Sequence, residues 1–440
     1  MKAYILFSLA LLSITAFAQV DKQRQSVKSK VDAIEGKVIG WRRDFHEHPE
    51  LGNREFRTSD IIARHLQSLG LEVKTGVGKT GVVGILKGAL PGPVIALRAD
   101  MDGLPVLEKN DLPFASKAKG EFNGQPVSVM HACGHDTHVA MLMGVAEVLS
   151  SMKSELKGTV KFIFQPAEEG PPVGEEGGAE LIVKEGVLEN PKVDVIFGLH
   201  ISSDLEVGKI RYRPGGAMAG AMDLKITVVG KPSHGASPWL SVDPILTSAQ
   251  IVYGLQTVVS RNVNITKNGA VVTIGSIHGG NRGNIIPEQV EMMGTVRTLS
   301  AADEKMVIRR INEIVTNTAE AAGATAKVEL PYTIHYPVTY NDPALTAKML
   351  PSVKKSAGEE NVVLGEAITG SEDFSFFSEK VPGLFLFLGG MPKGKDPATA
   401  GPHHTPQFIV DDSGLKLGVN ALSNLVFDYG KMNKSVAEPR

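Results

Sequence analysis

Four apolar runs without polar alternation constrain the fold of this 440-residue chain most strongly. They are Val94–Leu97, Val160–Phe164, Val193–Leu199 and Leu384–Leu388, and a helical pattern at residues 139–149 lies between the first two. An alternating strand buries one face, whereas a continuously apolar strand buries both. The chain is therefore predicted to form an α/β domain whose mostly parallel sheet is covered by helices. Apolar residues at helical spacing predict two further helices, at residues 58–69 and 413–427.

The pattern changes between residues 215 and 330. Leu224, Ile226 and Val228 alternate with polar residues, and two more strands are expected at residues 271–277 and 290–297. Helices are expected at residues 244–259 and 306–322, and Ser300 with Asp303 forms a helix-start pattern before the second. These features predict an inserted α+β domain at residues 215–330, which interrupts a first domain made of residues 19–214 and 331–440.

Residues 1–18 have the pattern of a secretory signal peptide. Lys2 precedes an apolar run too short to span a bilayer, and Ala16-Phe17-Ala18 is a small-residue cleavage pattern before Gln19. A short buried helix is the alternative, but the run is apolar on all sides instead of on one face. We expect cleavage after Ala18 and a periplasmic or secreted protein.

Composition argues against several classes of partner. The chain has 46 basic and 48 acidic residues without a basic cluster, so neither nucleic acid nor an anionic membrane surface is an expected partner. No later run approaches the roughly 20 apolar residues of a membrane helix. The single cysteine excludes an internal disulfide.

Acidic and imidazole side chains follow three of the apolar runs. Residues that follow parallel strands lie together at the carboxyl edge of the sheet, where binding and active sites form in open α/β folds. Cys133 and His135 stand two residues apart, a spacing suited to a loop that binds one ion. Together these groups offer enough sulfur, nitrogen and oxygen donors for a two-metal centre. The other candidate donors are Asp100, Asp102, Glu168, Glu169, His200, His403 and His404.

Glu168 and Glu169 are neighbours, so their side chains leave an extended backbone in different directions. One of them is then available as a ligand and the other as a proton carrier, the combination that hydrolyses amides with metal-activated water. Two alternatives for Cys133 stay open from the residues alone. It is either a buried small residue, or a nucleophile with His200 or His404 as its base.

Eight motifs, in order, resemble the amidohydrolase branch of the metallo-aminoacylase and carboxypeptidase superfamily, which includes hippurate hydrolases, auxin-conjugate amidohydrolases and N-acyl-amino-acid amidohydrolases. The resemblance runs from about Trp41 to the C-terminal helix. The motifs are RADMDGLP (98–105), HACGHDTHVAML (131–142), FQPAEEG (164–170), GLH (198–200), KPSHGASP (231–238), GNIIPEQVEMMGTVR (283–297), GSEDFSFF (370–377) and HHTP (403–406).

The resemblance implies a ligand set and two carboxylate roles. Cys133 would bridge two divalent metal ions per subunit, with zinc or manganese expected and cobalt or nickel also suited to these donors. Glu168 would be the general base that activates metal-held water, and Asp102 would orient the site. The other implied ligands are His135, Glu169, His200 and His404, the last chosen over His403 because it directly precedes Thr-Pro.

The resemblance also gives the inserted domain a function, as a lid and dimerisation domain. His234 would polarise the scissile carbonyl, reaching across a homodimer into the partner's site, while Asn284 and Arg297 would hold the substrate carboxylate. The implied substrates are N-acyl or N-aroyl amino acids. A dipeptidase or carboxypeptidase with the same site is the alternative activity, and a non-catalytic binding protein is the alternative from another class.

Overall fold

The computed structural model describes the backbone of residues 2–432 and the side chains of residues 22–432. Its residues form two compact units. Unit 1 comprises residues 1–214, 341–365 and 380–440, and unit 2 comprises residues 215–340 and 366–379. Unit 2 thus includes residues 331–340 and 366–379, which the sequence pattern had assigned to the first domain.

Unit 1 is built on an eight-stranded sheet in the order β1-β2-β6-β3-β7-β19-β8-β18. Its four central strands are parallel to one another, and they contain three of the predicted runs and the fourth from Val195 onward, which confirms the α/β prediction. The central strands are β3 (Leu90–Asp100), β6 (Lys157–Gln165), β7 (Val195–Glu206) and β19 (Gly383–Met391). The outer strands are β1 (Glu72–Val77), β2 (Gly81–Lys87), β8 (Ile210–Tyr212) and β18 (Val362–Leu364).

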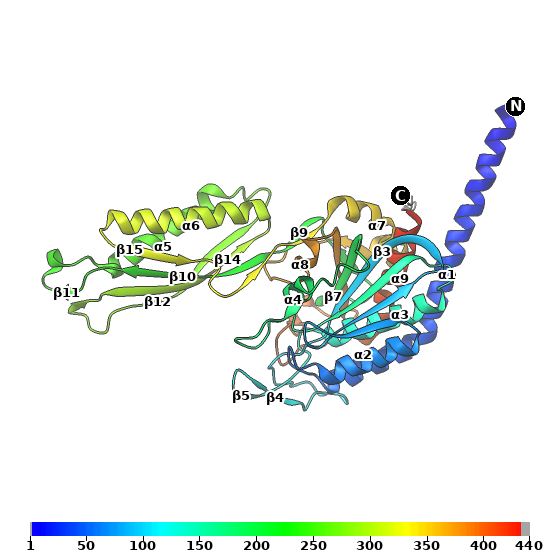
Figure 1. Ribbon diagram of the computed structural model, residues 1–440, viewed down its shortest axis with the longest axis horizontal. Coiled ribbons are helices and arrows are strands. Elements are labelled where there is room, and N and C mark those ends of the chain that lie inside the picture. Colours follow the sequence, from blue (N-terminus) through cyan, green and yellow to red (C-terminus); the bar gives the residue numbers. More distant parts are fainter. Residues whose placement is uncertain (1, 433–440) are drawn as a thin grey trace. The chain divides into compact units, whose positions relative to one another are not determined.

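Helices bury this sheet at the predicted positions. The helices α2 (Phe56–Ser68), α3 (His135–Ser151) and α9 (Leu415–Met432) correspond to the three expected in this unit (Figure 1). The core packs α3 and α9 against the central strands, with α1 (Lys2–Glu47) lying along both helices. Two shorter helices complete this unit: α4 (Gly178–Lys184) packs against β6, and α7 (Pro343–Ala357) packs against β18 and β19.

Of the expected signal peptide, residues 1–18, residue 1 lies outside the described residues and residues 2–18 belong to the continuous helix α1. The signal peptide stays a prediction. Within the described part of the chain, no helix combines the length and apolar character that a bilayer crossing requires.

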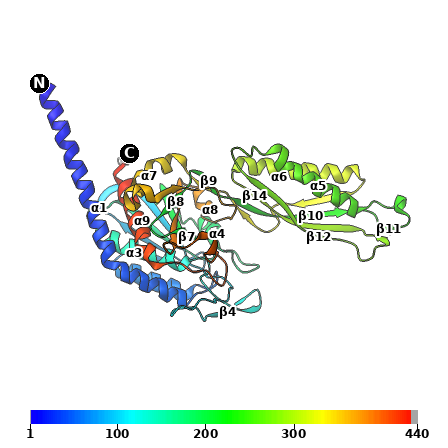
Figure 2. The ribbon, with the colours of Figure 1, turned by 180° about the vertical axis from the view of Figure 1, so that it is seen from behind.

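Unit 2 is an antiparallel sheet with two helices packed on one face (Figure 2). Its strand order is β12-β14-β10-β15, and alternate residues of β10 such as Leu224 and Ile226 are fully buried. Ser300 caps α6 by accepting a hydrogen bond from the Asp303 backbone N–H, as its position predicts. The elements are β10 (Gly220–Val229), β12 (Ala270–His278), β14 (Gln289–Thr298), β15 (Thr325–Glu329), α5 (Pro244–Asn262) and α6 (Ala301–Ala321).

Candidate metal centre

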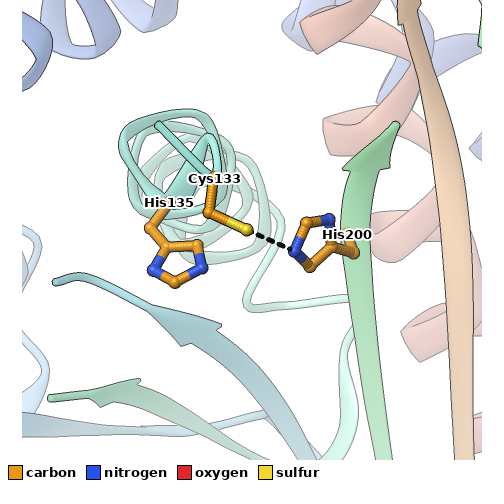
Figure 3. A group of neighbouring side chains, drawn as sticks. All are labelled: Cys133, His135 and His200. Carbon is orange, nitrogen blue, oxygen red and sulfur yellow. Dashed lines mark hydrogen bonds between the residues drawn. The ribbon is translucent and has the colours of Figure 1, made fainter. Parts of the chain in front are cut away.

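The carboxyl ends of the central strands carry the candidate ligands of unit 1. β3 ends at Asp100 and β6 at Gln165, three residues before Glu168, while His200 lies within β7. His135 is the first residue of α3, and Cys133 lies in the turn just before it, across from His200 on β7 (Figure 3). Gly134 between them has φ +90°, and a Cβ there would lie 2.4 Å from Ile201 Cγ2. Only glycine therefore lets this turn approach β7 closely enough to bring the thiol to the imidazole.

The structure brings together all five side chains that the resemblance implies as ligands. Cys133 Sγ lies 3.4 Å from His200 Nε2 and 3.3 Å from His404 Nε2. Glu169 Oε1 is 2.9 Å from His404 Nε2 and 4.0 Å from His135 Nε2. The sulfur is thus central to the cluster, the position that a ligand shared by two ions requires.

These donors fit divalent metal ions. Two tetrahedral zinc ligands, one sulfur and one nitrogen, lie about 3.6 Å apart at ordinary bond lengths, close to the observed sulfur–nitrogen separations. His135 Nε2 is buried and has no hydrogen-bond partner among the described residues. Its other nitrogen, Nδ1, donates to Asp102, whose backbone and carboxylate oxygens lie 3.0 and 3.1 Å away. Buried polar atoms are normally paired, so an unpaired nitrogen directed into a donor cluster points to an ion.

The charges of the cluster also call for a cation. Burial, together with the Glu169 and Glu168 carboxylates, holds the pKa of the Cys133 thiol well above its usual range. Burial lowers the pKa of His135, but the carboxylates of Asp100 and Asp102 outweigh burial and raise it to about 10. Without metal, the sulfur and this imidazole therefore keep their protons. A bound divalent ion would displace both protons and compensate the charge of the carboxylates.

Asp102 links two of the candidate ligands. Besides accepting from His135, its carboxylate accepts a hydrogen bond of 3.1 Å from the Glu169 backbone N–H. Asp102 is 2% exposed, so these bonds are shielded from water. The orienting role that the resemblance implies for Asp102 therefore has a physical basis in one carboxylate that holds both an imidazole and a loop.

Asp100 does not have a free oxygen for an ion. Its two carboxylate oxygens accept from Arg98 Nη1 at 2.6 Å and from His138 Nδ1 at 2.5 Å. Sequence reasoning included Asp100 among the candidate donors and left His138 without a role. Both residues belong to the support of the cluster, since His138 Nε2 also accepts the backbone N–H of Ile201.

The loop that carries the two glutamates has a buried support that sequence reasoning missed. Ala167 adopts φ +50°, an uncommon conformation for a residue with a side chain, directly before Glu168. Its backbone N–H donates to Glu55 Oε1 at 2.9 Å, and the other Glu55 oxygen accepts from the Thr80 hydroxyl. A glutamate that precedes a helix 112 residues earlier gives no signal of this contact in the sequence.

The three expected substrate-binding residues all lie in unit 2, at two ends of its sheet. His234 pairs with Ile285 beside Asn284, near the end of the sheet where Val229 pairs with Gln289. Arg297 lies eight residues further along β14 from Gln289, about 26 Å away at the rise of a strand. The register of β14 thus separates Asn284 and Arg297 of one chain, and their role in holding the substrate carboxylate stays a prediction.

Comparisons with known proteins agree with this geometry. Residues 96–428 match Peptidase family M20/M25/M40. Thermostable carboxypeptidase 2 of Saccharolobus solfataricus is 40% identical over 92% of this chain and 98% of its own length. N-acetylcysteine deacetylase of Bacillus subtilis is 39% identical over 89% of this chain and 97% of its own length. A crystal structure described as a dinuclear metal-binding peptidase of the M20 family, from Bacillus subtilis, has a TM-score of 0.75 and 35% identity, covering 91% of this chain and 99% of that one.

Proposed function

The chain belongs to Peptidase family M20/M25/M40, and on that premise we propose that it hydrolyses N-acyl or N-aroyl amino acids to a carboxylic acid and a free amino acid. It is an amide-hydrolysing enzyme of this family. The observation that carries the proposal is the cluster of five donors around Cys133, with the second carboxylate, Glu168, beside it. The relative named N-acetylcysteine deacetylase supports an N-acyl amino acid as substrate.

Two divalent ions would be held by the five donors, with Cys133 between them. Cys133, Glu169 and His404 form one group, and Cys133, His135 and His200 form another, each within 4.8 Å. The sulfur is common to both groups, which favours it as the bridging ligand. When bound, such ions polarise a carbonyl oxygen and lower the pKa of water. Thiolate, imidazole and carboxylate suit zinc or manganese, and also cobalt or nickel.

Glu168 is the general base of this proposal. Its Oε2 lies 3.7 Å from His135 Nε2, and the side chain is 9% exposed, so the carboxylate faces the same space as the ligands and is shielded from bulk water. Glu168 takes a proton from the attacking water and passes it to the leaving amine nitrogen. Asp102 keeps His135 and the Glu169 backbone in place during this transfer.

The separation of Asn284 and Arg297 favours a homodimer in which two chains contribute to one site. Within the described residues, the edge strand β12 of unit 2 has no pairing partner on its outer side, and none of its own residues is buried. An exposed edge strand can pair with a second copy. Arg297 would bind the substrate carboxylate, because a guanidinium offers two parallel donors. His234 and Asn284 would reach that substrate from the partner. We also propose export to the periplasm or the medium, on the pattern of residues 1–18.

Glu168→Gln tests the assignment of the base. The variant keeps the size of the side chain and removes its capacity to accept a proton, so it should fold, retain its metal and lose hydrolysis of N-acetyl amino acids by at least 100-fold. Turnover at the parent rate would refute the role of Glu168. The matched control is Glu189→Gln, an exposed carboxylate beyond α4, which should leave both metal content and turnover unchanged.

A dipeptidase or carboxypeptidase activity at the same site is the second candidate. It is favoured by the relative named thermostable carboxypeptidase 2. A hydrolysis panel of N-acetyl and N-benzoyl amino acids against free dipeptides and N-blocked dipeptides separates the two activities. Preference for the N-acyl amino acids supports our proposal, whereas faster cleavage of the peptides favours the second candidate. A protein that binds no divalent ion after reconstitution would instead be a non-catalytic member of the fold.

A further inference from the structure

Strand β7 continues beyond its neighbour on one side. β3 pairs with β7 only as far as Gly198, whereas β7 runs to Glu206. The Ile196 N–H donates to the Pro382 carbonyl, on the side of β7 that faces β19. Successive N–H groups of a strand point to alternate sides, so those of Ile201 and Ser203 point to the other side, where β3 has already ended. Backbone donors at such an edge need other acceptors when they are shielded from water.

Two imidazoles supply these acceptors. Ile201 N–H donates to His138 Nε2 at 2.8 Å, and Ser203 N–H donates to His403 Nε2 at 3.2 Å. A ring nitrogen that accepts a hydrogen bond carries no proton, so each neutral ring carries its proton on Nδ1. For His138 the geometry agrees, because Nδ1 faces an Asp100 oxygen, which only accepts.

For His403, the same argument directs a proton toward Cys133. His403 Nδ1 lies 3.7 Å from Cys133 Sγ, within the longer range of hydrogen bonds to sulfur, and the Cys133 backbone carbonyl is a second acceptor for the ring. The ring also packs against Phe408, with the two ring centroids 4.7 Å apart. Its orientation is therefore set by β7 and by packing, before any ion enters the site.

We propose that His403 is a positioning residue that donates its Nδ1–H to the sulfur of Cys133, with Ser203 fixing the tautomer. This inference rests on the proposed function, since it concerns the thiolate that would bridge the ions. A hydrogen bond to a ligand sulfur lowers the electron density that the sulfur donates and fixes the direction of its lone pairs. His403 thus acts through Cys133 and is not itself a ligand in this proposal.

Two substitutions separate the two nitrogens of the ring. In His403→Gln, the amide oxygen can take the place of Nε2 and accept the Ser203 N–H, but no donor remains at the δ position. In His403→Asn, the amide nitrogen can take the place of Nδ1 and donate to the sulfur, but the acceptor for Ser203 is lost. Thermal melting of each metal-free variant establishes that it is folded.

The readout is the sulfur-to-cobalt charge-transfer band of the cobalt-loaded protein, together with cobalt affinity from competition with a chelator. Cys133→Ser, which removes the sulfur, identifies the band. We expect His403→Gln to shift the band to lower energy and to bind cobalt roughly 10-fold more weakly, while His403→Asn keeps both closer to the parent values. An unchanged band in His403→Gln, or an equal shift in both variants, would overturn the role of His403.

Failure of this inference and failure of the proposed function give different results. A parent protein that binds cobalt and cleaves N-acyl amino acids, with a band that His403→Gln leaves unchanged, refutes only the hydrogen bond. A parent protein without a sulfur-to-cobalt band refutes Cys133 as a ligand, and with it both proposals.

Discussion

Replacing Asp102 by alanine tests how the protein prepares its metal ligands. The substitution removes the carboxylate acceptor of His135 Nδ1 and the acceptor of the Glu169 N–H, both at 3.1 Å. His135 keeps one acceptor, because the Asp102 backbone carbonyl also lies 3.0 Å from Nδ1 and is unaffected. The ring is therefore loosened but not released, whereas the Glu169 backbone loses its partner.

The expected cost follows from these contacts. A hydrogen bond to a charged group contributes about 1.5–3 kcal/mol, and the loss of such a support to a ligand weakens metal binding by roughly 10- to 100-fold, or about 1.4–2.7 kcal/mol. The deficit should shrink at lower pH. Asp102 helps to raise the pKa of His135 to about 10, so in its absence the ion displaces a less tightly held proton.

Competition with a fluorescent chelator, at pH 6.5 and pH 8.5, measures both effects. The matched control is Asp194→Ala, because the Asp194 carboxylate also accepts a hydrogen bond from a backbone N–H, that of Val94 at 2.7 Å, but lies toward the opposite end of β3. That variant should bind metal as the parent does. If Asp102→Ala folds normally and binds metal within twofold of the parent, Asp102 does not order these ligands.

Three further predictions concern the same unit. Cys133→Ser should lose its metal together with its activity, which metal analysis and an activity assay of the purified variant measure. A variant that kept its metal and lost only activity would favour Cys133 as a nucleophile. Burial and nearby carboxylates raise the pKa of Cys133, and although burial lowers the pKa of His135, carboxylates raise it to about 10. Metal binding should therefore release protons, and metal affinity should increase as the pH rises from 6 to 9. Calorimetry in buffers of different ionisation enthalpy measures this release, and equal heats in all buffers would contradict it. Asp136→Ala should lower the free energy of unfolding by about 3–5 kcal/mol, because it removes the buried carboxylate that pairs with both Arg42 and His46 and leaves Arg42 only Asp412, at 3.3 Å. Urea denaturation tests this, and a loss below about 1 kcal/mol would contradict it.

Much of unit 1 is predictable from sequence because its strands are buried on both faces. Runs such as Val160–Phe164 have no polar alternation, so they indicate parallel strands, and parallel strands bring their following residues to one edge. This is why Glu169 and His200 could be placed together without knowledge of the three-dimensional structure. Gly134 likewise marks a turn, and the structure shows what the turn approaches.

The supports of the site could not be predicted in the same way. Glu55, His138 and His403 act through contacts with residues far away in the chain, and no local pattern records such partners. The imidazoles of His138 and His403 accept N–H groups of β7 where β3 no longer pairs with it, and this need is known only once the structure shows that β3 ends before β7. Which of two adjacent histidines lies on the ligand side also depends on the backbone, since His404 adopts φ +64°.

The separation of Asn284 and Arg297 has a simpler cause. Both residues lie in one continuous motif, but the strand between them is extended along the whole length of the sheet, so residues of one motif lie at opposite ends. The boundaries of unit 2 were missed for a related reason, because residues 366–379 join it through contacts with elements far earlier in the chain, such as the pairing of Ile368 with Met218.

Metal content measured in parallel with hydrolysis tests the central claim most directly. The claim is that the cluster around Cys133 holds two divalent ions that serve amide hydrolysis. Reconstituted protein should contain two ions per chain, and cleavage of N-acetyl or N-benzoyl amino acids should rise with ion content and disappear on treatment with a chelator. Protein that binds no divalent ion after reconstitution, or that hydrolyses these substrates equally well without one, would contradict the claim.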